Sequence, residues 1–354
     1  MTVCFVLTTP YRAALAGGAE RWVAETARAL ARMVGVSVHY VAEGPDWGEV
    51  HGARRHRFAA VPARERDRLL LSPGLVAAAA RADVVHVHQF GTLSAQLAAL
   101  VGRMRRRSVF CTDLGSSGLA AGRRLRLDRL FHGFLELSEF AASHAPPDRR
   151  RIVYGGVDTE RFRPGPKADP PYALYVGRIL PHKGVDWLIR SLPDSLPLVV
   201  AGRPDDRYLA ELRELSEGRN VRFEIDPPDE RVAELYAAAR VAVLPSVSVD
   251  CYGTRRRIPE LLGLTALEAL ACGTPVVCSR VASLPEVVRP GATGLLVDER
   301  DERGLRDALE RLAADPDGAA KMGAAGREDV LARFTWERVA ARCLDAYREL
   351  GAAA

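Results

Sequence analysis

The sequence predicts an α/β protein made of two domains, each with a parallel sheet covered by helices on both faces. First, 354 residues exceed a single core and fit two domains of roughly 150 to 180 residues. Second, short apolar strands alternate with helical windows in both halves. Third, residues 159 to 173 hold four prolines and no periodicity, a pattern typical of a linker. We therefore expect domains at 1–158 and 159–334.

In the first half, buried strands alternate with helical segments. The first helix is expected over 20–33, with Trp22, Val23, Ala27 and Leu30 on its inner face. Further Ala- and Leu-rich helical windows follow it. The strands are expected at 2–8, 36–42, 83–88, 108–112 and 151–156.

The second half repeats the alternation. Strands are expected at 172–177, 197–202, 221–224, 241–246 and 275–279. Helices are expected near 184–192, at 206–217, at 229–239, in the segment that follows residue 260, and over 301–331. The last segment, 334–350, is amphipathic, with Val339, Cys343 and Tyr347 on one side.

Composition is that of a soluble globular protein, with 48% apolar and 27% charged residues. No apolar run reaches the roughly 18 to 20 residues of a spanning helix, and the N-terminus lacks the features of a signal peptide. The six cysteines form no C-x-x-C pair, so we expect reduced thiols. A cytoplasmic location follows as an expectation.

The basic charge is almost all arginine, because only residues 167, 183 and 321 are lysines. The net charge of +5 therefore reflects a bias in residue usage and is weak evidence for a binding surface, so we expect no nucleic-acid partner. The runs at 103–107 and 123–129 leave a weak association with a membrane surface open.

The segment 260–275, ELLGLTALEALACGTP, carries two glutamates eight positions apart, Glu260 and Glu268. Eight residues are a little over two helical turns, so both carboxylates are expected to point to the same side. Gly263, Leu264 and Thr265 lie where the chain would enter the helix. The free N–H groups and positive dipole of a helix start form an anion site.

Two cations follow the strand LYVG, Arg178 and Lys183. In open α/β sheets ligands bind beyond the carboxyl ends of the strands. Arginine offers a planar fork to oxyanions and lysine a compact charge. Gly17 and Gly18 precede a helix start, where an anion can approach the backbone closely. The alternatives without a binding role are a surface pair of cations for Arg178 and Lys183, and an ordinary N-cap turn for Gly17 and Gly18.

The segment 260–268 resembles the E-x7-E signature of family-4 glycosyltransferases, which are retaining enzymes of the GT-B fold that use nucleotide-sugar donors. YVGRILPHKG at 175–184 is similar to the donor-phosphate motif of the family, and AGGAE at 16–20 to its N-terminal glycine loop. LPS at 244–246, GVDTERFRP at 156–164 and PVV at 275–277 follow in the order of the family. The resemblance spans nearly the whole chain and is patchy between about 45 and 150.

This resemblance implies two Rossmann-like domains facing a central cleft, with the C-terminal helix, 335–350, crossing back to the first domain. It also implies transfer of a sugar from a nucleotide diphosphate to an acceptor hydroxyl. Glu268 would accept hydrogen bonds from ribose and Glu260 from sugar hydroxyls, while Arg178, Lys183 and the helix start would hold the phosphates. No metal and no other cofactor are expected. The sugar, the acceptor (glycan, lipid or natural product) and the oligomeric state stay open.

Acceptor-side candidates lie at strand ends of the first half. Many family members have a histidine near the reacting sugar, where this chain has Thr112 followed by Asp113. Asp113 would orient or deprotonate an acceptor hydroxyl, or alternatively cap the turn that follows it. His88 ends its strand facing the expected cleft, whereas His86 is expected to be a buried structural residue.

Residues 247–259, VSVDCYGTRRRIP, form a loop longer than in many members. It would contact sugar or acceptor through Asp250, Tyr252 or Arg255, or remain a solvated loop. A different class of function is a dinucleotide-dependent oxidoreductase or a non-catalytic nucleotide-binding module. Glu43 fits the ribose acid of such a site, but no G-x-G-x-x-G tightens the first turn.

Overall fold

The computed structural model describes residues 1–11, 18–42, 54–58, 76–77, 81–114 and 126–351. The chain divides into two compact units. Unit 1 comprises residues 1–156 and 336–354, and unit 2 comprises residues 157–335. The sequence places the domain boundaries at residues 158 and 334, and the units divide after residues 156 and 335. Within the described residues, no helix is long and apolar enough to cross a membrane.

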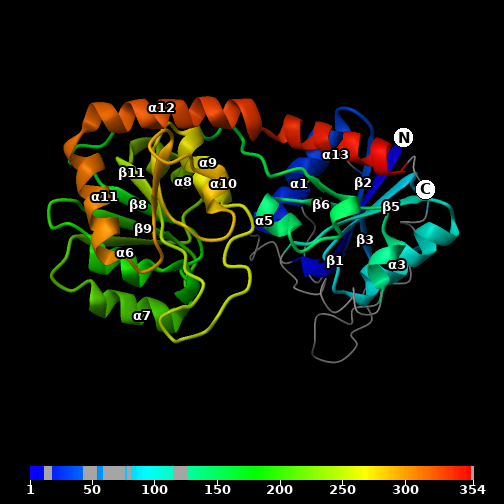
Figure 1. Ribbon diagram of the computed structural model, residues 1–354, viewed down its shortest axis with the longest axis horizontal. Helices are drawn as coiled ribbons and strands as arrows, with labels where there is room; N and C mark the ends of the chain where they lie inside the picture. Colours follow the sequence, from blue (N-terminus) through cyan, green and yellow to red (C-terminus); the bar gives the residue numbers. More distant parts are fainter. Residues whose placement is uncertain (12–17, 43–53, 59–75, 78–80, 115–125, 352–354) are drawn as a thin grey trace. The chain divides into compact units, whose positions relative to one another are not determined.

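Unit 1 contains a sheet of seven strands in the order β3-β2-β1-β4-β5-β6-β7 (Figure 1). All neighbouring strands pair in parallel. Because parallel strands need crossovers over the faces of the sheet, both faces are covered by helices. The strands are β1 (Thr2–Tyr11), β2 (Gly35–Ala42), β3 (Arg54–Phe58), β4 (Val84–His88), β5 (Ser108–Thr112), β6 (Gly133–Glu136) and β7 (Arg150–Ile152).

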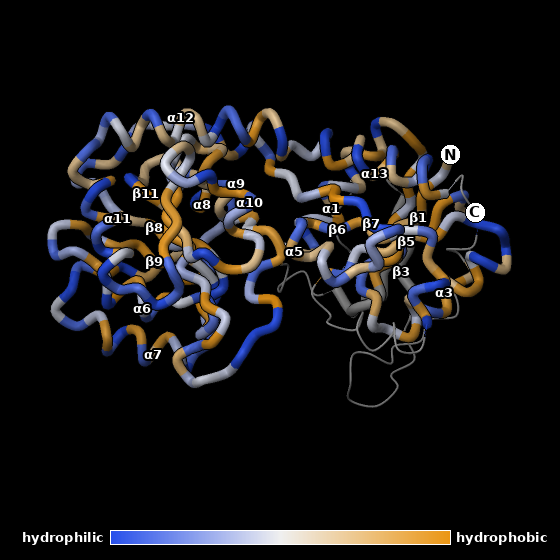
Figure 2. The backbone as a smooth tube through the Cα atoms, in the orientation of Figure 1, coloured by the Kyte–Doolittle hydropathy of each residue, from blue (hydrophilic) through white to orange (hydrophobic). Residues whose placement is uncertain are grey.

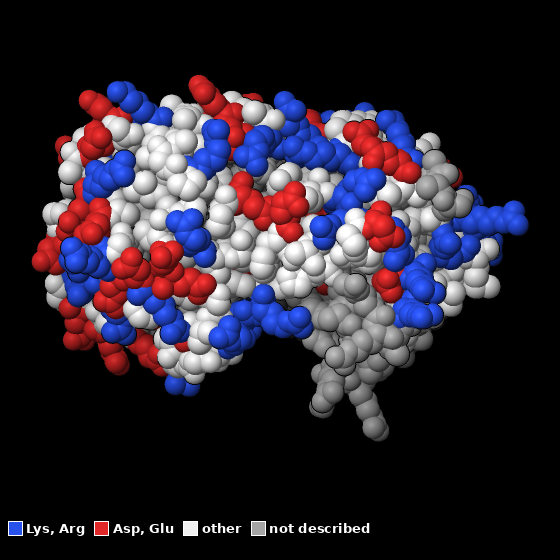
Figure 3. Space-filling model, viewed as in Figure 1, with Lys and Arg blue, Asp and Glu red and all other residues white. Residues whose placement is uncertain are grey.

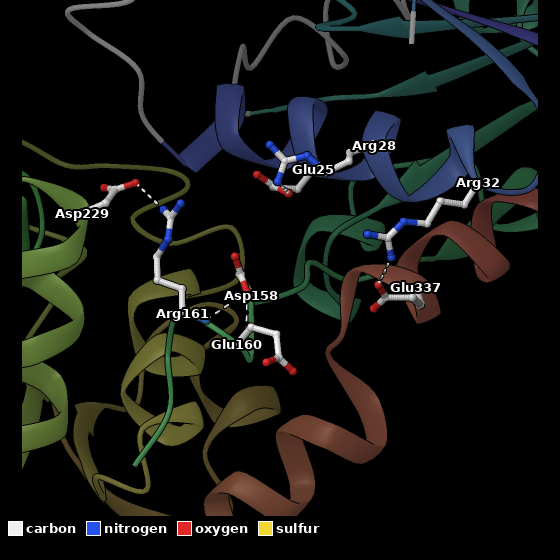
Figure 4. A network of polar contacts seen from close by, with 8 residues as sticks. All are labelled: Glu25, Arg28, Arg32, Asp158, Glu160, Arg161, Asp229 and Glu337. Atoms are coloured by element: carbon white, nitrogen blue, oxygen red, sulfur yellow. Dashed lines mark hydrogen bonds and ion pairs between the residues drawn. The ribbon is translucent and has the colours of Figure 1, made fainter. Parts of the chain in front are cut away.

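The C-terminal helix belongs to unit 1, as the resemblance implied. The described helices of unit 1 are α1 (Gly18–Ala31), α3 (Leu93–Met104), α5 (Glu139–Ala142) and α13 (Trp336–Gly351). Helix α13 packs on α1, and Arg32 pairs with Glu337 at 2.9 Å between the two helices (Figure 4). This pair is exposed and contributes little. The docking therefore depends on the buried apolar side of α13, which includes Val339 and Cys343.

A buried hydrogen-bond chain joins α13 to the centre of the sheet. The Thr112 hydroxyl donates its one proton to the Leu135 carbonyl at 2.7 Å. His86 Nε2, 2.9 Å away, must then donate to Thr112, so His86 Nδ1 accepts from the Tyr347 hydroxyl at 2.7 Å. Burial, and secondarily His88, hold the pKa of His86 well below its ordinary value, so the ring is neutral. The expectation that His86 is a buried structural residue is confirmed.

Unit 2 contains a sheet of six parallel strands in the order β10-β9-β8-β11-β12-β13. Its strands are β8 (Ala173–Val176), β9 (Leu198–Gly202), β10 (Val221–Ile225), β11 (Val241–Leu244), β12 (Val276–Ser279) and β13 (Gly294–Val297). Its helices are α6 (Val185–Ser191), α7 (Asp206–Leu215), α8 (Asp229–Ala238), α9 (Leu264–Ala271), α10 (Leu284–Val287), α11 (Glu302–Ala314) and α12 (Pro316–Arg333). With two parallel sheets and α/β order, the predicted fold class is confirmed.

The core of each unit lies between its sheet and its helices. Hydrophobic backbone segments run through the sheets, and hydrophilic segments lie on the outer faces of the helices (Figure 2). In unit 2 the core joins strands β8, β9 and β11 to α6 and α11. In unit 1 it joins β4 and β5 to α3. Burial of these apolar faces stabilises each unit independently.

Three expectations about single segments need correction. The proline-rich stretch 159–173 lies within unit 2 and is anchored there, because Phe162 is buried against Tyr236 and Arg161 pairs with Asp229 (Figure 4). The helix expected over 301–331 is two helices, since Asp315 caps α12 through the Gly318 N–H and a proline follows it. The strand expected at 151–156 ends at Ile152.

Several short elements were not predicted. Strand β3 is RRHRF, whose basic residues carry no apolar alternation. Strands β6 and β13 have four residues each, and so does α10, which is too short for a periodic pattern. Pairing with neighbouring strands of the sheet determines these strands.

Replacement of Tyr347 by phenylalanine tests the buried chain. The variant leaves His86 Nδ1 without its donor, so we expect the free energy of unfolding to fall by about 1–3 kcal/mol. Chemical denaturation followed by circular dichroism measures this change. The control is Tyr252→Phe, whose hydroxyl donates to Glu211 at an exposed surface, where the loss of one hydrogen bond should cost below about 0.5 kcal/mol. Equal effects of the two variants would contradict the assignment.

Candidate functional site

The strand order of unit 2 reverses direction between β8 and β11. Ligands of open α/β sheets bind at such a switch point, beyond the carboxyl ends of the strands. The segments that follow these two strands are residues 177–184 and 245–263. They carry Arg178, Lys183 and Glu260. The topology therefore brings these three sequence-predicted residues to one edge of the sheet.

The segment 177–184 is fixed at both ends. The buried Tyr175 hydroxyl donates to the Arg178 carbonyl at 2.7 Å. This bond fixes the backbone of Arg178, and the Arg178 side chain is exposed. At the other end Gly184 has φ 68°, and a Cβ there would lie 2.1 Å from the Pro245 carbonyl oxygen. Only glycine permits this approach. The lysine before it is thereby held against the end of β11.

Lys183 and Glu260 form an ion pair between the Lys183 Nζ and Glu260 Oε1 atoms. The same carboxylate oxygen accepts from the Ser246 hydroxyl at 2.7 Å. Both charged side chains are mostly buried, with relative exposures of 16% and 13%. Lysine has three donors and a carboxylate has two acceptor oxygens. The ammonium thus keeps capacity for phosphate oxygens, and Glu260 Oε2 keeps capacity for hydroxyl groups.

The helix start expected at residues 263–265 is confirmed, and Glu260 therefore does not share a helix with Glu268. The helical spacing used to place both carboxylates on one side does not apply to this pair. Helix α9 begins at Leu264, after Gly263 with φ 87°. Glu260 lies in the preceding loop, and its carbonyl accepts from Ser283 at 3.3 Å. A loop position leaves Glu260 free of the helical register, so its contact with Lys183 comes from the loop and not from a two-turn spacing.

The start of α9 is the position at which the sequence predicts an anion site. A Cβ on Gly263 would lie 2.6 Å from Leu284, so glycine lets the helix begin close to α10. The N–H groups of Leu264 and Thr265 belong to the first turn, which lacks intrahelical acceptors and carries the positive end of the helix dipole. Glu268 lies one turn further and is buried, with 6% exposure.

His182 precedes the lysine and is buried. Burial, followed by the charges of Lys183 and Arg256, lowers its pKa to about 4. The ring is therefore neutral near pH 7 and adds no charge to the site. The positive charge at the segment 177–184 comes from Arg178 and Lys183.

In unit 1, His88 ends β4 at the corresponding switch point beside β1. Its ring is enclosed by Phe5 and Trp22, with centroids 4.8 and 5.7 Å away, and burial lowers its pKa to about 3. The expected orientation toward open space is therefore not observed within unit 1. Its role in the reaction stays a prediction.

Asp113 follows β5 and is buried. The end of the neighbouring strand β6 carries Glu136, which is 2% exposed. Burial, and then the charge of Asp113, raise the pKa of Glu136 well above its ordinary value. The buried Glu136 carboxyl group thus lies near Asp113 at the carboxyl edge of this sheet, where its protonated form is favoured. Glu136 was not predicted, because a lone acid at the end of a four-residue strand carries no sequence signal.

Gly18 is the first residue of α1 and is exposed, while Gly17 lies outside the described residues. The structure therefore groups Arg178, Lys183, Glu260, Gly263 and the α9 start in unit 2, and places the other candidates in unit 1. Ser246 and Tyr175 also support the site and were not predicted to do so. Ser246 could have been found from its place in the LPS motif at 244–246. Among the described residues, no cluster of three His, Cys, Asp or Glu side chains could hold a metal.

Two family models match the chain. The model described as Glycosyl transferases group 1 matches residues 156–329, and the model described as Glycosyltransferase Family 4 matches residues 16–161. Together they span both units. The first includes the ion pair of Lys183 with Glu260 and the start of α9.

The chain is similar to several known proteins. It is 30% identical to D-inositol 3-phosphate glycosyltransferase 1 of Catenulispora acidiphila, covering 94% of this chain and 91% of that protein. It is 36% identical to alpha-maltose-1-phosphate synthase of Mycolicibacterium smegmatis over 58% of each chain, so the match spans little more than half of that relative. The structure of sucrose-phosphate synthase from Thermosynechococcus elongatus superposes with a TM-score of 0.76 at 26% identity, covering 100% of both chains.

The buried acid Glu136 predicts a specific pH dependence of stability. Because its pKa is raised in the folded state, the unfolded chain releases this proton first as the pH rises above 4.5, and its contribution to folded stability then declines until the folded pKa is reached. Glu136→Gln should therefore stabilise unit 1 at pH 7 to 8 and flatten this decline. Denaturant unfolding between pH 5 and 8 measures it. Glu328→Gln, at an exposed site, is the control. Destabilisation by Glu136→Gln at pH 8 would contradict the assignment.

Proposed function

Since the chain belongs to the family-4 glycosyltransferases, we propose that it moves a sugar from a nucleotide-diphosphate donor to an acceptor hydroxyl. The observation that carries the proposal is the group of Arg178, Lys183 and the α9 start at the switch point of unit 2. These are three sources of positive charge for one diphosphate. Glu260 is held beside them by Lys183 and Ser246.

The proposed chemistry depends on the leaving group. As the glycosidic bond breaks, the diphosphate gains negative charge, and fixed cations interact more strongly with it than with the intact donor. Arg178 offers two parallel hydrogen bonds to phosphate oxygens. The ion pair with Glu260 holds the Lys183 ammonium in place, so little reorganisation is needed during the reaction.

We further propose retention of configuration and independence from metal ions. In the retaining reaction the acceptor hydroxyl attacks from the face that the diphosphate leaves, and a donor phosphate oxygen takes the proton. The His88 ring is enclosed by Phe5 and Trp22, and burial lowers its pKa to about 3, so it is a weak base, which supports proton transfer to the donor phosphate. Asp113 would orient the acceptor hydroxyl. The cations of unit 2 would neutralise the leaving group in place of a metal.

The relatives support a hexosyl donor and leave its identity open. Their names include a maltose-1-phosphate synthase, an inositol 3-phosphate glycosyltransferase and a GDP-mannose-dependent mannosyltransferase. These names differ in sugar and acceptor. The alternative of a dinucleotide-dependent oxidoreductase is not favoured by these relatives. The described cysteines are all free thiols, which supports a cytoplasmic location.

A screen of nucleotides tests the proposal. Thermal unfolding is followed with UDP, GDP, ADP, their hexose conjugates and NAD. One nucleoside diphosphate and its sugar conjugate should raise the melting temperature, while NAD should not. The sugar conjugate that is protective is then tested for hydrolysis. Protection by NAD alone would favour the oxidoreductase.

Removal of the phosphate cations should reduce turnover, and circular dichroism is used to establish that each variant is folded before it is assayed. Lys183→Ala and Arg178→Ala should each lower kcat by about 100- to 1000-fold, the usual effect of losing a preorganised charge contact in catalysis. Hydrolysis or transfer with the donor from the screen measures it. Lys321→Ala and Arg311→Ala, at exposed sites of the same unit, are the matched controls. Wild-type turnover in either test variant would remove that cation from the site.

Chelation tests the proposed independence from metal ions. Activity should persist in excess EDTA, because fixed cations neutralise the leaving group. Rates are compared before and after dialysis against chelator. Complete loss that Mg²⁺ or Mn²⁺ restores would contradict this part of the proposal.

A further inference from the structure

The loop 247–259 connects β11 to the segment that precedes α9. It forms a tight hairpin, in which Val249 pairs antiparallel with Arg255. The Asp250 carboxylate is buried inside the turn and accepts from the N–H groups of Tyr252 at 3.1 Å and Thr254 at 2.9 Å. The turn is therefore defined by its own side chain, unlike the solvated loop that the sequence left open.

The base of the hairpin is attached to unit 2 at two places. The Val247 N–H donates to the carbonyl of His182 at 2.9 Å, which ties the loop to the segment that carries Lys183. The Ser248 N–H and hydroxyl donate to the two carboxylate oxygens of Glu299 at 2.6 and 2.8 Å. Arg300 adds a hydrogen bond to the Asp250 carbonyl at 3.2 Å.

The turn is attached to α7. The Tyr252 hydroxyl donates to the Glu211 carboxylate, and the Arg207 guanidinium lies over the Tyr252 ring, 4.9 Å from its centroid. Arg207 also pairs with Glu211 at 3.1 Å. The hairpin is thus held from both ends, and the backbone that leads out of it toward Glu260 starts from a fixed position.

The second arm of this hairpin carries three consecutive arginines, Arg255, Arg256 and Arg257. All three are exposed. Among the described residues, their side chains make no ion pair or hydrogen bond, whereas Arg207 and Arg300 on the neighbouring elements are both engaged. Basic side chains gather along the lower margin of unit 2, where the chain passes from β11 to α9 (Figure 3). The nearby carboxylates of Asp250, Glu299 and Glu211 are engaged by backbone and hydroxyl groups of the hairpin, and the three guanidinium groups have no ion-pair partner among the described residues.

These arginines lie near the proposed donor-phosphate site. The hairpin base contacts His182, and the charge of Arg256 acts on the His182 ring together with that of Lys183. The positive charges of Arg256 and Lys183 both act on His182. Repulsion among such cations lowers the stability of the folded protein, and a bound anion would reduce this repulsion. Arg178, Lys183 and the α9 start already suffice for one diphosphate. The three arginines are additional to that requirement.

We propose that the hairpin 247–259 binds a second anionic group, a phosphate or carboxylate carried by a sugar substrate outside the donor diphosphate. The guanidinium fork suits both oxyanions, since it offers two parallel hydrogen bonds. The inference rests on the proposed function, because it takes the diphosphate to lie at Arg178 and Lys183. The anion comes from the donor sugar or from the acceptor, and both sources share this chemistry.

Calorimetric titration of the full chain tests the proposal. The protein is first saturated with UDP, GDP or ADP, whichever protects it in the thermal screen, and then titrated with glucose, glucose 1-phosphate and glucuronate as acceptor-like probes. In a separate series, UDP-glucose and UDP-glucuronate are compared as donor-like probes. The test variant is Arg255→Gln/Arg256→Gln/Arg257→Gln. The control variant, Arg163→Gln/Arg213→Gln/Arg311→Gln, removes the same charge from exposed positions elsewhere in unit 2.

At least one anionic probe should bind the wild type more tightly than its neutral counterpart. The test variant should bind that probe about 10- to 100-fold more weakly, the usual effect of losing charge-assisted hydrogen bonds, and the control variant should bind it like the wild type. Preference for UDP-glucuronate assigns the anion to the donor, and preference for a sugar acid or phosphate assigns it to the acceptor.

Equal binding of the anionic probe by wild type and test variant would overturn the proposal, and so would the absence of any preference for an anion in the wild type. Affinity for the nucleoside diphosphate should change only a few-fold in the test variant. If the wild type binds no nucleoside diphosphate, the proposed function itself fails. The two failures are therefore distinguishable.

Discussion

The ion pair between Lys183 and Glu260 is the interaction on which the site in unit 2 depends. It joins two segments that leave adjacent strands of the sheet, one after β8 and one after β11. Lys183 ends a short 3-10 helix, Pro181–Lys183, and Glu260 lies in a loop, so the sheet alone does not determine their separation. The pair lies mostly out of solvent, where removal of one partner leaves an uncompensated charge and is costly. Ser246 adds a hydrogen bond to the same oxygen. The result is an ammonium in a fixed place at the edge where ligands of such sheets bind.

The two units use polar groups in different ways. In unit 1 the groups at the centre of the sheet are neutral and satisfy one another, as in the chain from Tyr347 through His86 to Thr112. Such a network makes α13 part of the unit without placing a charge in the core. In unit 2 the mostly buried ion pair of Lys183 with Glu260 lies at the carboxyl edge, and the core cluster of this unit is hydrophobic. The acid Glu136 is the exception in unit 1, where burial raises its pKa.

Much of this architecture could be predicted from the sequence, because strand and helix periodicities are local properties. The positions of Arg178 and Lys183 followed from a strand that ends at Val176. The position of the Glu260 side chain could not be predicted from its eight-residue spacing to Glu268. Helical spacing applies only when one helix includes both residues, and α9 begins after Glu260, with Gly263 as its N-cap. Strand β3 and the acid pair of Asp113 with Glu136 depend on neighbours distant in sequence. Tertiary pairing supplies what local pattern lacks.

Hydrogen–deuterium exchange with the protective nucleoside diphosphate tests the central claim most directly. If Arg178, Lys183 and the start of α9 hold the diphosphate, peptides covering 177–184 and 260–268 should exchange more slowly when the ligand is bound. Strand β10 is an edge strand of the same sheet, and peptides from α7 and β10, residues 206–225, should exchange at an unchanged rate. Protection confined to unit 1, with 177–184 and 260–268 unaffected, would contradict the account.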